Sequence, residues 1–366
     1  MKTPFLKLFG SLALMVLVSS ICVPSISRAA TRIVAWGNNS SGQTNVPPGL
    51  TNAIAVAGGR FHSLALTEDG RVVAWGDNSL GQTNVPAGLS NVVAVAAGEY
   101  FSLALKSDGT QVFWGAWWGL SGWTTNLPYT FANSNIVAIA AGANHGLALD
   151  PNGFVSAWGS NFEGQCNVPA GLSNVVAVGA GGDGSVALKA DGTVSTWGGT
   201  CGGPSGPAGW TNLIAIAGWD LGLSADSTVV GSCVGGVPVG LSNIVAVAPG
   251  MALEEDGTVF VWHVTNVPPV LTNITAIGAG WGHCLAIVGH GPPIQHTLLN
   301  NPTMAANGFK VTVPTQSGRV YALEYKTSLQ GPNWTALPLA AGNGGMVTLT
   351  DPAAAGAQRF YRVRRW

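Results

Sequence analysis

Short apolar runs recur along the chain at a spacing near 40 residues, and polar turns separate them. Residues 32–70 and 71–109 are two such units of 39 residues each, and they match almost position for position. Further units begin at Thr110, Phe154, Thr193, Thr228 and Thr258, which gives seven in all. Self-similarity at a fixed period of this size is the signature of a repeat architecture.

Within a unit, three runs have the character of β-strands. They are typified by VVAVAAG, SLALK and RVVAW, and an Asp-Gly pair between the second and third predicts a tight hairpin. The segment QTNVP is predicted as a short fourth strand that ends at its proline, which suits a sheet edge. Both alternating faces of VVAVAA are apolar, so each sheet is expected to be covered on both sides.

A period near 40 with about four strands is typical of a β-propeller blade, and closing the ring removes exposed sheet edges. The strand Arg32 to Trp36 has no preceding partner, and the seventh unit ends in HCLAI with no following one. We therefore predict an all-β fold, with a seven-bladed β-propeller over residues 30–291 whose last blade is completed from both ends. An open solenoid of seven units is the alternative.

Residues 292–366 depart from the repeat and alternate in polarity, as in FKVTVPT and RFYRVRR. This predicts a small C-terminal antiparallel β-domain behind a Gly-Pro-Pro linker. The domain carries seven basic and two acidic residues, whereas residues 30–291 carry five and fourteen, so the net charges are +5 and −9. An acidic propeller argues against nucleic acid as its partner, and the basic tail is expected to dock either on the propeller or on an anionic envelope surface.

Residues 1–29 have the pattern of a secretory signal peptide. Lys2 and Lys7 precede an apolar run from Leu8 to Val23, and Ser27-Arg28-Ala29 offers a cleavage site. The alternative is a membrane anchor, but the run is short for a span and nothing later resembles one. The sequence therefore predicts an exported protein that is secreted, periplasmic or on the cell surface, with no transmembrane span after signal cleavage.

Four cysteines remain after cleavage. Outside the cytosol a disulfide is permitted, and Cys201 with Cys233 is the preferred pair because both fall early in successive repeats. Cys284 lies in a predicted core strand and is expected to be a buried free thiol. Since no Cys or His spacing fits a metal ion, we predict no metal and no cofactor.

The recurring VxAWGxNxxGQTNVPxGLxNVVAVAAGxxHSLALxxDG resembles the RCC1-type repeat, and its short form is similar to the exported bacterial β-lactamase inhibitory protein II. The resemblance covers about residues 32–288 and implies a propeller that binds protein, through aromatic and acidic loop residues on one face. Phe61, Tyr100, Trp219 and Trp281 fit that pattern. Ala143 and Gly182 with Asp183 depart from it, and the sixth unit lacks the loop.

Two sets of loops are expected on the same face of the ring, and loops are where function usually resides. One set follows the first strand of each unit, and the other follows the Trp-Gly strand. Besides the candidates given next, this face collects Arg60, Asp77, Glu99, Phe162 and Glu163. The candidate partner-binding residues are Phe61, Tyr100, Trp117, Trp118, Trp123, Asp183, Trp219, Asp220 and Trp281.

Other aromatic and histidine residues have structural explanations. The repeat tryptophans occupy one fixed strand position and are expected to pack between blades: Trp36, Trp75, Trp114, Trp158, Trp197 and Trp262. Likewise, His62, His145 and His283 share one repeat position and are expected in turns or core. The candidate face itself has a structural alternative, a set of solvated turns with scattered apolar residues.

No nucleophile elbow, P-loop or zinc-protease motif is present, so we predict that the protein is not an enzyme. Glu99, Asp183 and Asp220 could supply paired carboxylates for glycoside hydrolysis, which is the enzymatic alternative. The second alternative is a glycan-binding module whose exposed rings stack on sugar faces. The leading hypothesis is an exported propeller that binds an extracellular or periplasmic protein.

Overall fold

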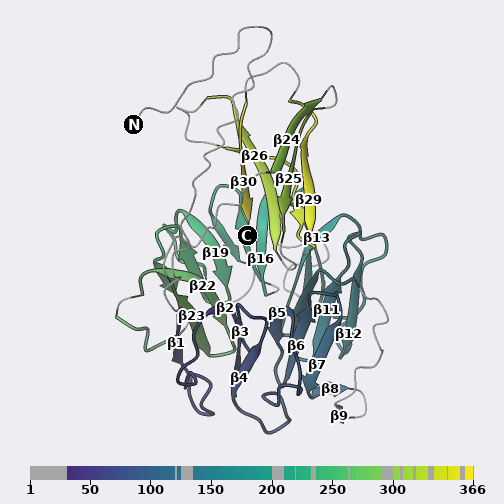
Figure 1. Cartoon of the computed structure of the whole chain (residues 1–366). Coiled ribbons are helices and arrows are strands. Elements are labelled where there is room, and N and C mark those ends of the chain that lie inside the picture. Colours follow the sequence, from purple (N-terminus) through teal and green to yellow (C-terminus); the bar gives the residue numbers. More distant parts are fainter. Residues whose placement is uncertain are drawn as a thin grey trace.

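The computed structural model describes residues 31–365 apart from 120–121, 125–134, 200–209, 219, 232–235, 263, 270, 290–299, 306–307, 316–318, 329–333, 344 and 355–358. All regular secondary structure in this part of the chain is β (Figure 1). Among the described residues, none belongs to a helix long and apolar enough to cross a membrane. The predicted signal peptide and both cysteines of the preferred disulfide lie outside the described residues.

Between residues 32 and 289, the described strands form seven three-stranded antiparallel sheets and one two-stranded hairpin. In chain order of their first strands, the sheets are β2 (Ala53–Gly58), β3 (His62–Thr67) and β4 (Val72–Gly76); β5 (Val92–Ala97), β6 (Phe101–Lys106) and β7 (Gln111–Gly115); β10 (Ala138–Ala141), β11 (His145–Leu149) and β12 (Val155–Gly159); β13 (Val175–Gly181), β14 (Gly184–Lys189) and β15 (Val194–Gly198); β16 (Leu213–Ala217), β17 (Leu221–Ser224) and β18 (Val229–Gly231); β19 (Ile244–Ala248), β20 (Met251–Glu254) and β21 (Val259–Val261); and β22 (Ile274–Ala279), β23 (His283–Val288) and β1 (Arg32–Gly37).

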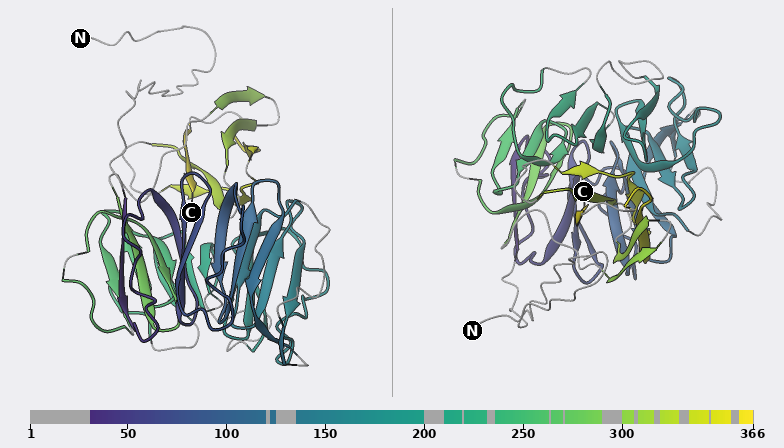
Figure 2. Two further views of the ribbon diagram at one scale, coloured as in Figure 1. Left: turned by 60° about the horizontal axis from the view of Figure 1, so that its bottom comes forward. Right: turned by 90° about the horizontal axis from the view of Figure 1, so that it is seen from above.

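The sheets close into a ring. The first strands of consecutive sheets contact one another in cyclic order, and β22 contacts β2 across the junction (Figure 2). There β1 pairs with β23, from Arg32 opposite Val288 to Gly37 opposite His283. The predicted closure by strands from both ends is confirmed, and the open solenoid is wrong.

The prediction of a fourth strand at QTNVP is wrong. In the first unit Gln43 and Thr44 form a turn and residues 45–47 are irregular, and main-chain and side-chain groups of the segment bond locally. The Asn39 amide oxygen accepts from the Thr44 N–H at 3.0 Å, and its Nδ2 donates to Asn45 Oδ1 at 2.8 Å. Main-chain N–H and C=O groups that form hydrogen bonds within the segment are not available to pair with a neighbouring strand.

The repeat tryptophans pack between sheets, as predicted for Trp36, Trp75, Trp114, Trp158 and Trp197, which are all buried. Three of them also donate a hydrogen bond to the main chain of a repeat glutamine. Trp75 Nε1 donates to the Gln43 carbonyl at 2.8 Å, and Trp114 and Trp197 make the same bond to Gln82 and Gln165 at 2.9 Å. Trp36 Nε1 is buried and has no partner within the described part of the chain.

This difference predicts unequal changes in stability for two matched substitutions. Trp75→Phe removes a buried donor and its hydrogen bond, so we expect the free energy of unfolding to fall by about 1 kcal/mol beyond the packing change. Trp36→Phe removes a donor that is already unsatisfied, so we expect a smaller loss or a gain. Urea unfolding of both variants checks this, and equal losses would contradict it.

The repeat histidines join each sheet to the next. His62 Nε2 lies 3.0 Å from Ser102 Oγ, His145 Nε2 lies 2.9 Å from Ser185 Oγ, and His283 Nε2 lies 2.9 Å from Ser63 Oγ. Each serine hydroxyl also donates to a glutamine carbonyl, as Ser63 does to Gln43 at 2.8 Å. Since the serine proton is used there, each histidine Nε2 must donate and carries a proton, and burial lowers the pKa of these rings to about 4, which keeps them neutral near pH 7.

At one junction between sheets, both residues of the histidine–serine contact are replaced. Phe101 occupies the histidine position of its sheet, and Gly146 occupies the serine position of the next one. The three histidines are buried as predicted, and they form one component of the joints between sheets.

Residues 300–365 form two further sheets. One contains β24 (Asn300–Ala305), β25 (Gly308–Pro314) and β29 (Met346–Asp351); the other contains β26 (Val320–Lys326), β27 (Thr335–Ala336), β28 (Ala340–Ala341) and β30 (Phe360–Arg365). Their own core includes Phe309, Val311, Tyr321, Leu323 and Val363. Seen from above, these strands lie over the ring (Figure 2).

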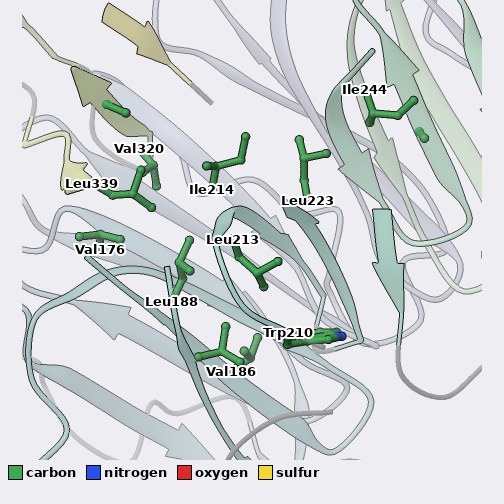
Figure 3. Packing of buried hydrophobic residues seen from close by; sticks show 13 residues of the cluster. Val176, Val186, Leu188, Trp210, Leu213, Ile214, Leu223, Ile244, Val320 and Leu339 are labelled. Atoms are coloured by element: carbon green, nitrogen blue, oxygen red, sulfur yellow. The ribbon is translucent and has the colours of Figure 1, made fainter. Parts of the chain in front are cut away.

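The C-terminal sheets contact the ring mainly through apolar side chains. Val320 and Leu339 pack with Val176, Leu188 and Ile214 at the ends of the ring strands (Figure 3). The Leu339 N–H donates to the Ala190 carbonyl at 3.0 Å. Docking on the propeller was one of the two expected roles of this part of the chain.

Candidate functional site

The ring has two faces, and the C-terminal sheets lie on one of them. That face carries the hairpin turns between the second and third strands, and we call it the turn face. The opposite face carries the loops that follow the first and third strands, as the sequence predicted. We call it the aromatic face, defined by Arg60, Phe61, Tyr100, Trp118, Trp123 and Trp281. It lies at the lower end of the ring in Figure 1, where β8 and β9 are labelled.

Main-chain hydrogen bonds tie the inner loops of the aromatic face to one another. The Trp281 N–H donates to Gly59 at 3.2 Å, and the Arg60 N–H donates to Glu99 at 3.4 Å. The Glu99 N–H then donates to Ala143 at 2.9 Å, and the Ala143 N–H donates to Gly182 at 2.8 Å. Four loop-to-loop junctions in a row therefore each have a main-chain hydrogen bond, so the side chains on these loops start from fixed backbone positions.

A charged pair lies at the centre of this row. Arg60 Nη1 forms an ion pair with Glu99 Oε1, and the Glu99 side chain is only 9% exposed. The guanidinium carbon of Arg60 lies 5.2 Å from the Phe61 ring centroid, 5.8 Å from that of Tyr100 and 5.0 Å from that of Trp281. These are cation–π distances, so one arginine organises three aromatic rings.

The third unit adds a small hairpin to this face. β8 (Trp117–Gly119) pairs with β9 (Gly122–Thr124), with Trp118 opposite Trp123. Trp117 is 8% exposed, so the expectation that it is available to a partner is corrected. Successive side chains of a strand point to opposite sides, so Trp117 points inward while Trp118 points outward.

Trp118 and Trp123 continue the aromatic surface away from Arg60. Their rings meet edge to face with centroids 5.2 Å apart, and Trp123 meets Tyr100 in the same way at 5.0 Å. Both tryptophans are 46% exposed and Trp281 is 60% exposed. The alternative of scattered apolar residues is not favoured, because these rings are connected by contacts.

The acidic candidates fall into two groups. Asp77 accepts from Ser79 and Gln82 in its own loop, and Glu99 is paired with Arg60, so both have structural partners. Asp183 and Glu163 are exposed and flank Gly199, and Asp183 Oδ1 also accepts from Gln165 at 3.1 Å. Burial raises the pKa of Asp220. The outward negative charge of this face therefore lies on the side of Glu163 and Asp183.

Some sequence candidates are not brought into the site. Trp219 lies outside the described residues.

Cys284 is a buried free thiol as expected, and burial raises the pKa of its thiol to about 12. Phe162 is 60% exposed on a loop beside Glu163. Among the described residues, no group of three or more His, Cys, Asp or Glu could hold a metal ion.

The sequence analysis missed Asn144. Its Nδ2 donates to Glu99 Oε2 at 3.2 Å, and its Oδ1 accepts from the Trp118 N–H at 2.9 Å. The signal was present in AGANH, where an amide replaces the ring that Phe61 and Tyr100 provide at the same repeat position.

Comparison with known proteins places this geometry in a known class. The family model described as Regulator of chromosome condensation (RCC1) repeat matches residues 53–82 and 136–165. The crystal structure of Prp20p from Saccharomyces cerevisiae is similar over 72% of this chain and 92% of that chain, with 21% identity and a TM-score of 0.57. The fold is an RCC1-type β-propeller.

A second structure, of yeast RCC1 (Prp20) bound to Kap60, is similar over 72% of this chain and 90% of that chain, with 20% identity and a TM-score of 0.58. The first structure is described together with its binding properties to Gsp1p and histones. No curated protein sequence matches this chain. The RCC1-type propeller is an architecture consistent with a protein-binding module.

Proposed function

We propose that this RCC1-type propeller is an exported, non-enzymatic protein that binds a protein partner through the aromatic face. The observation that carries the proposal is the exposure of Trp118, Trp123 and Trp281 in a surface whose loops are already tied together. Binding hot spots are rich in tryptophan, tyrosine and arginine, and fixing them before contact lowers the entropy cost of association.

Charge on this face narrows the chemistry of the partner. The aromatic surface lies beside the exposed carboxylates of Glu163 and Asp183. A complementary surface therefore has an apolar centre with lysine or arginine at one side, and its association weakens as salt rises. Prp20p is described with binding properties to Gsp1p and histones, which supports protein binding as the class of function here.

The finer parts of the proposal rest on the sequence. Export is inferred from residues 1–29, with residues 30–291 as a seven-bladed propeller and residues 292–366 as a separate small domain. The similarity to β-lactamase inhibitory protein II favours an enzyme as the protein partner. Tryptophan pairs also suit sugar faces, so glycan binding is the second candidate, whereas Glu99 is committed to Arg60 and does not favour a glycosidase.

The test is a triple substitution, Trp118→Ala with Trp123→Ala and Trp281→Ala. We expect a partner captured from culture supernatant by the wild-type protein to bind the variant at least about 100-fold more weakly, because truncating a single hot-spot ring costs about 2 kcal/mol or more and 100-fold corresponds to about 2.7 kcal/mol. The matched control is Phe154→Ala, since Phe154 is 64% exposed beside a turn on the opposite face. Equal affinities of the triple variant and wild type would contradict the proposal, and a glycan array with specific hits would favour the alternative.

A further inference from the structure

Six residues of the aromatic face form a closed series of contacts. Arg60 pairs with Glu99, Glu99 accepts from Asn144, and Asn144 accepts from the Trp118 N–H. Trp118 then contacts Trp123, Trp123 contacts Tyr100, and the Tyr100 ring lies beside the Arg60 guanidinium. The series joins the β2–β3, β5–β6 and β10–β11 loops to the β8–β9 hairpin, so a polar half and an aromatic half support each other.

Asn144 is the link between the charged centre and the hairpin. Its amide accepts a hydrogen bond through Oδ1 and donates one through Nδ2, and a carboxylate or a hydrocarbon side chain cannot do both. On one side it satisfies the second oxygen of Glu99, whose first oxygen faces Arg60. On the other side it accepts from the main-chain N–H of Trp118, at the start of the exposed surface.

The hairpin needs such a support. Its strands have three residues each, and a two-stranded hairpin is marginally stable by itself in water. Packing of the buried Trp117 anchors the first strand, but the Trp118 and Trp123 rings are 46% exposed and bury only part of their surface, so their placement depends on more than packing.

We infer that Asn144 is the positioning residue of the aromatic face, which holds the Trp118–Trp123 pair where a partner meets it. The role in binding rests on the proposed function, whereas the role in ordering the hairpin does not. Asn144 acts through the Trp118 amide and through Glu99, and its own side chain is half-buried beneath the surface that a partner would touch.

The experiment compares Asn144→Ala with Asn161→Ala. Asn161 also carries an amide that is engaged on a loop of this face, where its Nδ2 donates to Asn167 Oδ1, and it makes no contact in the series above. The first readout is the exciton signal of the edge-to-face indole pair in circular dichroism, identified as the signal that Trp123→Phe removes. We expect Asn144→Ala to abolish this signal and Asn161→Ala to keep it, with thermal unfolding of both variants close to wild type.

Exchanging the amide and the carboxylate between positions 144 and 99 distinguishes a positioning role from a general loss of structure. Asn144→Asp alone keeps the acceptor for Trp118 but places a second carboxylate against Glu99, so we expect a weakened signal. Adding Glu99→Gln restores a donor and acceptor between the two side chains, and we expect the signal to return. An unchanged exciton signal in Asn144→Ala would overturn the inference.

Partner affinity is the second readout, and it tests the proposed function separately. We expect Asn144→Ala to weaken binding about tenfold, the size of one lost hydrogen bond to a charged network. If Asn144→Ala loses the exciton signal but binds the partner with wild-type affinity, Asn144 positions the hairpin and the hairpin does not contribute to binding.

Discussion

The free energy of unfolding is expected to fall steeply as the pH is lowered from 6.5 to 4. Burial lowers the pKa of His62, His145 and His283 to about 4, and for His62 the neighbouring His283 adds to the effect. In the unfolded chain these groups titrate near 6.5, so within this window the unfolded state binds up to three more protons. Stability therefore rises with pH across the window, and below pH 4 this contribution levels off because both states are protonated.

The magnitude is large because three equivalent groups act together. Each bound proton changes the stability by about 1.4 kcal/mol per pH unit, so each histidine contributes on the order of 3 kcal/mol and the slope reaches about 4 kcal/mol per pH unit. Protonation would place a charge and a second N–H at Nδ1, which is buried and has no partner in the described part of the chain.

Urea unfolding at half-unit pH steps measures the slope, and the chain itself supplies the control variant. His62→Phe with Ser102→Gly copies the natural pair Phe101 and Gly146, and it is expected to reduce the slope by about a third. The carboxylates of the hairpin turns add a slope of the same sign only near the lower end of the window, because hydrogen bonds from Thr110 lower the pKa of Asp108 in the folded state while unfolded carboxyls titrate near 4, so the range from pH 6.5 to 5 reports the histidines. A flat curve from pH 6.5 to 4, or an unchanged slope in the double variant, would contradict the assignment.

Repetition made most of the fold predictable. Several copies support the inferences about strand positions, Asp-Gly hairpins and buried tryptophans, because these features recur in the units. The closure was predictable because the strand Arg32 to Trp36 complements the incomplete seventh unit. The QTNVP segment misled because its extended, proline-terminated pattern suits an edge strand. Its asparagine side chains instead bond the segment to itself, and that competition is decided by local geometry that the pattern does not contain.

The site was predictable to a lesser extent, since it is built where the units differ. Loop position correctly placed Phe61, Tyr100 and Trp281 near one another. The division of Trp117 from Trp118 followed from a two-stranded hairpin inserted in one unit only, for which no second copy gave guidance. The pairing of Glu99 with Arg60 and the bridging amide of Asn144 depend on contacts between loops about 40 residues apart, which a single sequence does not reveal.

The two faces of the ring have different roles in this arrangement. Val320, Ala322 and Leu339 join the propeller cluster at the turn face, so the basic C-terminal part of the chain meets an acidic propeller mostly through hydrocarbon. Burial lowers the pKa of Arg364, and Glu324 of the same C-terminal sheet opposes this more than Glu255 of the propeller does, so charge contributes little across the contact. The contact leaves the aromatic face open, which is the condition that the proposed function requires.

Leu339→Asp is expected to separate the C-terminal sheets from the propeller. Leu339 is 7% exposed in the shared cluster, and a carboxylate buried there without a partner costs several kcal/mol, on the order of the 2 to 5 kcal/mol lost when a buried leucine is truncated. The contact should therefore open, the radius of gyration from small-angle scattering should rise, and calorimetry should resolve two transitions. Met346→Asp is the matched control, because Met346 is 52% exposed on the same part of the chain and its replacement is expected to change stability by about 0.5 kcal/mol or less. Since the aromatic face lies at the other end of the ring, partner affinity should be the same in both variants. A single transition with an unchanged radius in Leu339→Asp would mean that the apolar contact does not hold the two parts together.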